Sequence, residues 1–193
     1  PWCAYNVAPG LERKVEDNSA GYISIPGLFV STDGQRHVLE TGRPTENVVG
    51  DVWKQPNGYV WNIWDQGIAD ATAEYGGPIL YCSDGFEEEI SGGYVVKADT
   101  VEALAEAIGA PELVTTLEEY NGYCAAGKDE QFYKPACFLQ PVAEGPFYAM
   151  QYEPSAWVTI GGIRTNDRLQ AIDDAGIAIP GLYVAGADNG TLM

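Results

Sequence analysis

The order of three glycine-containing motifs near the end of the chain restricts its fold more than any other feature of the sequence. The motifs are Gly145-Pro-Phe-Tyr-Ala-Met150, Thr159-Ile-Gly-Gly-Ile-Arg164 and Ile179-Pro-Gly-Leu-Tyr-Val-Ala-Gly-Ala-Asp-Asn-Gly190. This order predicts a strand, a glycine turn, a second strand and a glycine-rich loop. Because glycine lets a backbone approach a phosphate or a ring closely, such a junction is typical of a nucleotide-binding crevice. The chain stops at Met193, where a helix usually follows, so we expect it to be part of a longer protein.

The composition is that of a globular protein with a strongly acidic surface. Of the 193 residues, 46% are hydrophobic and 20% are charged, and the net charge is −18. This charge argues against nucleic acid and anionic membrane as partners, since both require positive surface. No apolar stretch approaches the ~20 residues of a membrane span, so we expect no membrane insertion. An acidic substrate would need a local cationic pocket built from only ten Lys and Arg side chains.

The sequence gives no sign of a metal site. The four cysteines are widely separated: Cys3, Cys82, Cys124 and Cys137. The absence of a C-x-x-C pair argues against zinc and iron–sulfur sites, and the spacing favours buried or unpaired thiols without excluding a disulfide. We expect the single histidine, His37, to be a partly buried structural imidazole.

Local patterns predict an α+β domain after an irregular connecting segment at residues 1–20. A strand at 27–32, the turn signal Asp33-Gly34 and a returning strand at 36–39 predict a hairpin. An alternating pattern predicts a further strand at 59–65, with the side chains of Val60, Asn62 and Trp64 on one face.

Two consecutive helices are expected after a short strand at 94–97. Asp99 or Thr100 caps the first helix, and Gly109 ends it. Leu104, Ala107 and Ile108 form its expected buried face. The second helix opens at Pro111, carries Leu113, Leu117, Tyr120 and Tyr123 at helical spacing, and extends to Gly127.

The three glycine motifs resemble those of the fumarate reductase and succinate dehydrogenase flavoprotein family, which includes single-chain bacterial reductases. That family shows a GPFYA-like strand, then T-x-GG, then PGLYAAGE followed by Gly. Its upstream G-K-R-F-x-N-E element is echoed by Gly34-Gln-Arg-His-Val-Leu-Glu40. Four motifs in the expected order, spread over residues 21–193, make coincidence an unlikely explanation.

The resemblance implies a clamp (capping) domain inserted into an FAD-binding domain. The clamp would cover residues 21–156, and residues 157–193 would be a partial re-entry into the FAD-binding domain. No G-x-G-x-x-G fingerprint follows any expected strand, so the pyrophosphate-binding half lies outside this chain. We therefore expect the isolated chain to bind FAD weakly and to be inactive by itself.

The resemblance also implies that this chain is part of an FAD-dependent oxidoreductase. Such an enzyme reduces the C=C bond of an unsaturated acid or enone. In the family, a clamp arginine shortly after the glutamate of G-K-R-F-x-N-E donates the proton, and Arg43 matches it best. An arginine needs carboxylates to supply protons because its pKa lies above ~12. Glu40 and Glu46 are near enough in sequence to do so. The alternatives are a surface Arg43 and a structural Arg36–Glu40 pair, and we favour that structural role for Arg36.

A departure from the family pattern bears on the substrate. Fumarate-type members carry a His-His pair before T-x-GG, and here Trp157 and Val158 occupy those positions, followed by Thr159. A tryptophan can bound a flat apolar substrate but cannot neutralise a carboxylate. We therefore expect a substrate other than fumarate, larger or less charged. Trp157 as core packing is the alternative.

The glycine motifs supply the expected cofactor contacts. Gly161 and Gly162 allow the backbone to approach the flavin, and their N–H groups can donate hydrogen bonds to it. In the family, the glutamate of PGLYAAGE follows the glycine that corresponds to Gly186. Here Ala187 and then Asp188 occupy this stretch, so that contact is shifted or lost.

Two other functions stay open from the sequence. One is a 3-ketosteroid-dehydrogenase-like flavoenzyme that uses tyrosines for proton transfer. The other is a non-enzymatic carbohydrate- or protein-binding domain, in which aromatic residues (Trp53, Tyr59, Trp61, Trp64) would stack on sugars. The reductase hypothesis implies a small-molecule substrate and an electron-donor domain or protein as partners. The sequence leaves the compartment undetermined.

Overall fold

A computed structural model describes residues 2–7, 27–40, 50–74, 87–159 and 161–191. Its contacts divide the chain into two compact units, one of residues 6–154 and a smaller one of residues 1–5 and 155–193. Arg43 and Cys82 lie outside the described residues. Among the described helices, none is long and apolar enough to cross a membrane.

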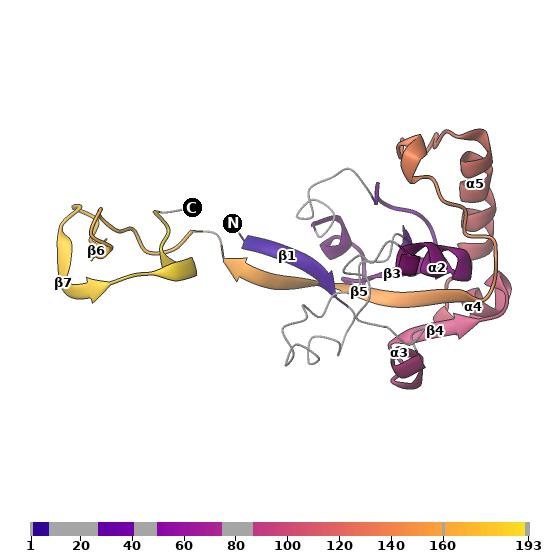
Figure 1. The fold of residues 1–193 in the computed structure, drawn as a ribbon, viewed down its shortest axis with the longest axis horizontal. Helices are drawn as coiled ribbons and strands as arrows, with labels where there is room; N and C mark the ends of the chain where they lie inside the picture. Colours follow the sequence, from indigo (N-terminus) through magenta and orange to yellow (C-terminus); the bar gives the residue numbers. More distant parts are fainter. Residues whose placement is uncertain (1, 8–26, 41–49, 75–86, 160, 192–193) are drawn as a thin grey trace. The chain divides into compact units, whose positions relative to one another are not determined.

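A five-stranded sheet forms the framework of the larger unit, whereas residues 2–5 of its first strand belong to the smaller unit (Figure 1). Its strands are β1 (Trp2–Val7), β2 (Leu28–Val30), β3 (Val60–Asp65), β4 (Val95–Ala98) and β5 (Phe147–Thr159). The strand order is β1-β5-β3-β2, and β4 also pairs with β5. In the register between β3 and β5, Asn62 lies opposite Met150 and Trp64 opposite Tyr148.

The hairpin expected after β2 is shorter in the structure than in the sequence prediction. A turn closes where Gly34 N–H donates to the carbonyl of Ser31 at 2.9 Å, and Gly34 has a φ of 96°. A Cβ on Gly34 would lie 2.5 Å from the backbone nitrogen of Leu113, so the turn packs directly on the start of a helix. The returning strand at 36–39 is reduced to a single bridge between Val30 and Arg36.

Strand β3 is covered on both faces. Val60, Asn62, Ile63 and Trp64 are all fully buried, and Trp61 is half-buried. Helix α2 (Gln66–Glu74) follows β3 directly and packs against it. Because Trp64 has no exposed surface, it cannot stack on a sugar.

Helices α3 (Glu87–Ser91), α4 (Val101–Ile108) and α5 (Leu113–Ala126) complete the larger unit. Thr100 Oγ1 caps α4 by accepting from Ala103 N–H at 3.2 Å, and Gly109 ends it with a φ of 69°, as predicted. Ala105, not the exposed Ala107, joins Leu104 on the buried face. Helix α5 begins at Leu113, two residues after the expected opening at Pro111.

The larger unit has a continuous apolar core between the sheet and these helices. Fully buried members come from β2, β3, β5, α4 and α5: Leu28, Ile63, Trp64, Leu104, Leu113 and Met150. Burial of this area is the main stabilising contribution to such a unit. The expected burial of Leu113, Leu117 and Tyr120 on α5 is confirmed.

The smaller unit is built on a hairpin of β6 (Gln170–Ile172) and β7 (Ala178–Tyr183). A 3₁₀ turn at Gly186–Asp188 follows β7. The buried apolar side chains among its described residues are Ala171 and Val184. Because the described apolar core is so small, hydrogen bonds contribute much of the stability of this unit.

His37 is a structural imidazole in the larger unit, as predicted. Both ring nitrogens are buried, and neither has a hydrogen-bond partner among the described residues. Burial lowers the pKa of His37 from 6.5 to about 4, and the charge of Asp51 opposes this effect only in part. The folded protein therefore requires His37 to be neutral.

Replacement of His37 by phenylalanine, the residue of the family element, is predicted to remove a pH dependence of stability. Between pH 6.5 and about 4 the unfolded chain binds a proton that the folded chain does not, so stability falls as the pH falls. We expect His37→Phe to stabilise the protein by roughly 2 kcal/mol at about pH 4.5, after allowance for solvent screening. At neutral pH we expect little difference. Urea unfolding at several pH values measures this, and a constant difference across the range would contradict it.

Candidate functional site

The glycine motifs of the smaller unit meet backbone to backbone. Ile163 N–H donates to the carbonyl of Asp188 at 2.9 Å, and Gly190 N–H donates to the carbonyl of Ile163 at 3.1 Å. A Cβ on Gly162 would lie 2.2 Å from the carbonyl oxygen of Asp188, and one on Gly190 would lie 2.5 Å from the nitrogen of Gly162. The T-x-GG turn and the loop after β7 can approach this closely only because glycine occupies both positions.

A buried polar network supports this contact. Asn189 has no exposed surface, and its side chain bonds to Thr165, Thr191 and the carbonyl of Val184. Thr191 Oγ1 in turn accepts from Thr165 N–H at 2.9 Å. The network therefore joins the segments on either side of the two glycine motifs.

The closely packed glycines are a backbone cradle of the kind that a planar cofactor needs. The side chains of Ala187 and Asp188 are exposed at the loop surface, and Gly161 and Gly186 have positive φ values of 101° and 69°. A Cβ on Gly161 or Gly186 would meet no described atom within 4 Å, so these two backbones are open to a ligand. The structure thus brings Gly162 against Asp188 and leaves open backbone beside them.

A second concentration of functional groups is a buried ionic cluster in the larger unit, around Arg36. Arg36 Nε and Nη2 each donate to Glu40 at 3.2 Å, and Nη1 and Nη2 donate to Asp129 at 3.1 and 2.9 Å. Lys134 Nζ lies 3.5 Å from Glu40 Oε2 and donates to the hydroxyl of Tyr120 at 3.0 Å. We call Arg36, Glu40, Tyr120, Asp129 and Lys134 the Arg36 cluster.

The surroundings of the Arg36 cluster shift the pKa values of Asp129 and Lys134. Burial by itself would raise the pKa of Asp129, but Arg36 and three backbone N–H groups outweigh it and lower that pKa to about 2. Burial and the charge of Arg36 lower the pKa of Lys134. The Arg36 guanidinium also lies over the rings of Tyr120 and Phe132, at 5.0 and 4.9 Å from the ring centroids. The predicted structural pair of Arg36 and Glu40 is confirmed.

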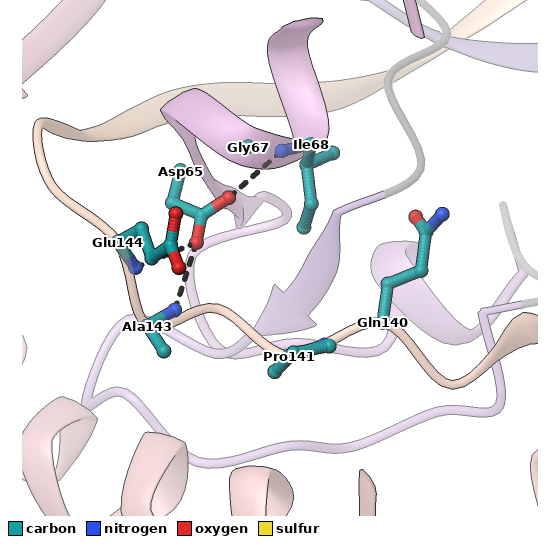
Figure 2. A pocket seen from close by; sticks show the side chains of 7 residues that line it. All are labelled: Asp65, Gly67, Ile68, Gln140, Pro141, Ala143 and Glu144. Atoms are coloured by element: carbon teal, nitrogen blue, oxygen red, sulfur yellow. Dashed lines mark hydrogen bonds between the residues drawn. The ribbon is translucent and has the colours of Figure 1, made fainter. Parts of the chain in front are cut away.

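A cavity of about 220 Å³ lies beside the start of α2 (Figure 2). It is lined by Asp65, Gly67, Ile68, Gln140, Pro141, Ala143 and Glu144. Asp65 accepts backbone hydrogen bonds from Ile68 at 2.9 Å, Ala143 at 2.8 Å and Glu144 at 2.9 Å. Its carboxylate therefore caps α2 and ties it to the segment before β5. The described residues that line it include two acidic side chains, Asp65 and Glu144, and no cationic one.

Comparison with known proteins shows the family of the chain. A sequence model of the family described as FAD binding domain matches residues 27–193. The chain belongs to this FAD-binding family. The match includes both glycine motifs of the smaller unit, and the mixed α/β fold of small sheets agrees with that of FAD-binding flavoprotein reductases.

The curated relatives of this chain include reductases and 3-oxosteroid 1-dehydrogenases; one of the latter, from Mycolicibacterium smegmatis, is 36% identical over 121 residues, which cover 54% of this chain and 21% of the relative. An NADH:acrylate oxidoreductase from Vibrio harveyi is 35% identical over 165 residues, which cover 84% of this chain and 16% of the relative. A vinyl phenol reductase from Lactiplantibacillus plantarum is 31% identical over 179 residues, which cover 84% of this chain and 36% of the relative.

A solved structure of a fumarate reductase has a similar fold. The open conformation of a flavocytochrome c3 fumarate reductase matches 98% of this chain with a TM-score of 0.72 and 26% identity, and the match covers 31% of that protein. The predicted resemblance is therefore confirmed. The chain spans 16% to 36% of the length of these four proteins.

The residues predicted to act on the substrate fall mostly outside what the structure describes. Arg43 is not among the described residues. Trp157, Val158 and Thr159 belong to β5, but their side chains are not described. Glu40 is described and lies in the Arg36 cluster. The roles of these residues in this member of the FAD-binding family stay predictions.

The sequence analysis missed Asp129, Lys134 and Asn189. Asp129 and Lys134 stand in a stretch of charged and polar residues that is typical of a surface loop. The available signal was Arg36 itself, since a guanidinium that becomes buried requires carboxylate partners. Nothing in the sequence indicates that the Asn189 side chain turns inward.

Disruption of the Arg36 cluster is predicted to destabilise the larger unit strongly. Arg36→Met leaves Glu40 and Asp129 buried without their main partner, and we expect a loss of about 3–5 kcal/mol in the free energy of unfolding. Lys54→Met is the control, because the Lys54–Asp51 pair at 3.3 Å has a largely exposed lysine and should matter little. Urea denaturation measures both, and equal effects would contradict the prediction.

Gly162→Ala is predicted to separate the two glycine motifs. The added Cβ would overlap the carbonyl of Asp188, so the backbone has to move and the Ile163–Asp188 hydrogen bond should weaken. We expect the Ile163 amide to exchange its hydrogen faster in the variant. Gly176→Ala serves as control for the backbone strain of an alanine at positive φ: its φ is 79°, but a Cβ there meets no described atom within 4 Å. Unchanged exchange at Ile163 in Gly162→Ala would contradict the proposed close packing.

Proposed function

We propose that this chain is the clamp and the re-entering part of the FAD-binding domain of a reductase. This reductase reduces the C=C bond of an unsaturated organic acid or enone. Residues 21–156 would form the clamp, and residues 157–193 would re-enter the FAD-binding domain. The observation that carries the proposal is the contact between Gly162 and the 188–190 loop, in a segment that the FAD-binding family model matches. The names of the relatives, an acrylate and a vinyl phenol reductase, support the reaction class.

The backbone of the smaller unit would hold the cofactor. Gly161 and Gly162 on one motif, and Gly186, Ala187 and Asp188 on the other, present open or exposed backbone next to each other. Their N–H groups can donate to the polar edge of a flat ring, and such fixed donors need little reorganisation as charge develops. The Asp188 carboxylate would take the place of the family glutamate toward the sugar-like part of the cofactor. Bound FAD, once reduced, supplies a hydride to one carbon of the double bond.

The clamp would supply the proton to the neighbouring carbon. Arg43 is the proposed donor, three residues after Glu40. Ion pairs with Arg36 and Lys134 hold the Glu40 side chain in place. Arg43 follows only three residues later, so the backbone before it would be anchored at Glu40. Glu40 is also the proposed source of the proton that restores Arg43 after each turnover. Hydride and proton together saturate the double bond, and the electrons come from a donor domain or protein.

The substrate would contact the end of β5. Trp157 and Val158 stand where fumarate-type relatives carry their histidine pair, and they would offer an apolar wall in its place. Thr159, the first residue of T-x-GG, would add a hydroxyl group beside them. The net charge of −18 disfavours approach of a dicarboxylate further. We propose that the substrate carries an aromatic or aliphatic tail, or is a ring enone, and is not fumarate.

The first test is reoxidation of the reduced flavin in the intact protein that contains this chain. We expect visible flavin absorbance that is bleached on reduction and returns with an aromatic enoate but not with fumarate. Arg43→Gln should slow that return by a factor of about 10²–10⁴, the usual contribution of an acid catalyst, without change in the flavin spectrum. Lys54→Gln, an exposed cation of the clamp, is the matched control and should react normally.

Three results would separate the parts of the proposal. A colourless intact protein that takes up no FAD would contradict the function as a whole. Reoxidation by fumarate would contradict the role given to Trp157 and Val158. Full activity of Arg43→Gln would contradict the proton donor alone.

A further inference from the structure

We propose that Asn189 is a positioning residue that fixes the distance between the two glycine motifs which would hold the flavin. The side chain does not itself contact the cofactor in this proposal. It acts through the backbone on either side of the crevice. The inference rests on the proposed function, since it assigns a structural cause to the geometry of that site.

Asn189 occupies the centre of the smaller unit, where an apolar residue would be expected. Its side chain is fully buried, and Thr165, Ala171 and Val184 are the other buried members among the described residues of this unit. Burial of an amide costs free energy unless its donors and acceptor are satisfied. A polar group at the middle of a small core therefore indicates a specific role in orienting the surrounding segments.

The amide of Asn189 connects three separate segments. Its Oδ1 accepts from Thr165 Oγ1 at 3.1 Å and from Thr191 N–H at 2.9 Å. Its Nδ2 donates to the carbonyl of Val184 at 3.4 Å. Thr165 follows the T-x-GG turn, Val184 follows β7, and Thr191 follows the second glycine motif, so one side chain spans all of them.

The backbone on both sides of Asn189 forms the contact between the motifs. Ile163 and Asn189 form a parallel bridge, with hydrogen bonds to the carbonyl of Asp188 and from Gly190 N–H. The interaction of Asn189 with Thr165 anchors the Ile163 side of this bridge. Its interactions with Val184 and Thr191 anchor the other side. The bridge is therefore held at both ends by one amide.

Loss of the Asn189 side-chain amide should weaken the contact between the two glycine motifs, although no atom proposed to touch the cofactor is removed. In the intact flavin-binding protein, we expect Asn189→Ala to weaken FAD binding by about tenfold or more, as expected for lost buried hydrogen bonds. Hydrogen exchange at the Ile163 and Gly190 amides should accelerate in the same variant. This second readout requires neither FAD nor activity.

A control in the same hairpin separates positioning from general stability. Asp173 Oδ1 accepts from the amides of Ala175 and Ile177 at 2.9 and 2.8 Å in the turn between β6 and β7. Asp173→Ala therefore removes two exposed turn hydrogen bonds from this unit and no side-chain hydrogen bond to the glycine motifs. We expect its FAD affinity and its Ile163 and Gly190 exchange to match the unchanged protein.

The conservative variant Asn189→Asp should show rescue that depends on pH. When protonated, the carboxyl group can accept from Thr165 and donate to Val184 as the amide does. When ionised it is a buried charge, for which no cationic partner is present among the described residues around Asn189 (Thr165, Val184, Thr191). Burial should raise its pKa. FAD affinity and amide protection should therefore recover as the pH falls to about 5 and be lost at about 8.

The inference is overturned if Asn189→Ala keeps FAD affinity within about twofold and keeps its amide protection. It is also overturned if Asp173→Ala weakens FAD binding as much as Asn189→Ala does. If the unchanged intact protein takes up no FAD, the proposed function fails and the role toward flavin fails with it. Amide exchange at Ile163 and Gly190 then decides separately whether Asn189 fixes the motifs.

Discussion

The bidentate contacts of Arg36 with two buried carboxylates are the interaction on which the larger unit depends. Arg36 follows the first turn of the sheet, Glu40 leads toward the segment of Arg43, and Asp129 lies after α5. A buried guanidinium of this kind is costly to desolvate, so it adds specificity more than net stability. What it fixes is the relative placement of the turn at Gly34, Glu40 and the segment after α5. An apolar replacement would bury as much surface but could not define that placement.

In the smaller unit, neutral polar side chains hold the segments in place. Its apolar core is minimal, and Asn189 with its threonine partners holds two backbone segments at a distance that only glycine allows. In both units a buried polar side chain thus joins segments that are distant in the sequence. In both, the group that does the fixing is separate from the groups that would touch cofactor and substrate.

The sequence predicted those parts of the fold that depend on local chemistry. Thr100 and Gly109 delimit α4 as expected, because capping involves residues only a few positions apart. The glycine motifs likewise indicated the FAD-binding family. The prediction of a returning strand at 36–39 was wrong. The Arg36 side chain instead pairs with Asp129, which lies 93 residues away in the sequence. Such pairings, and the inward turn of Asn189, depend on tertiary contacts that no local pattern contains.

The central claim is that the cofactor lies against the two glycine motifs, and not in the cavity beside Asp65. Hydrogen–deuterium exchange of the intact protein with and without FAD tests it most directly. The account predicts that FAD slows exchange at Gly161–Gly162 and Gly186–Gly190 and leaves the amides of Ile68, Ala143 and Glu144 unchanged. Protection around Asp65 with no change at the glycine motifs would contradict it.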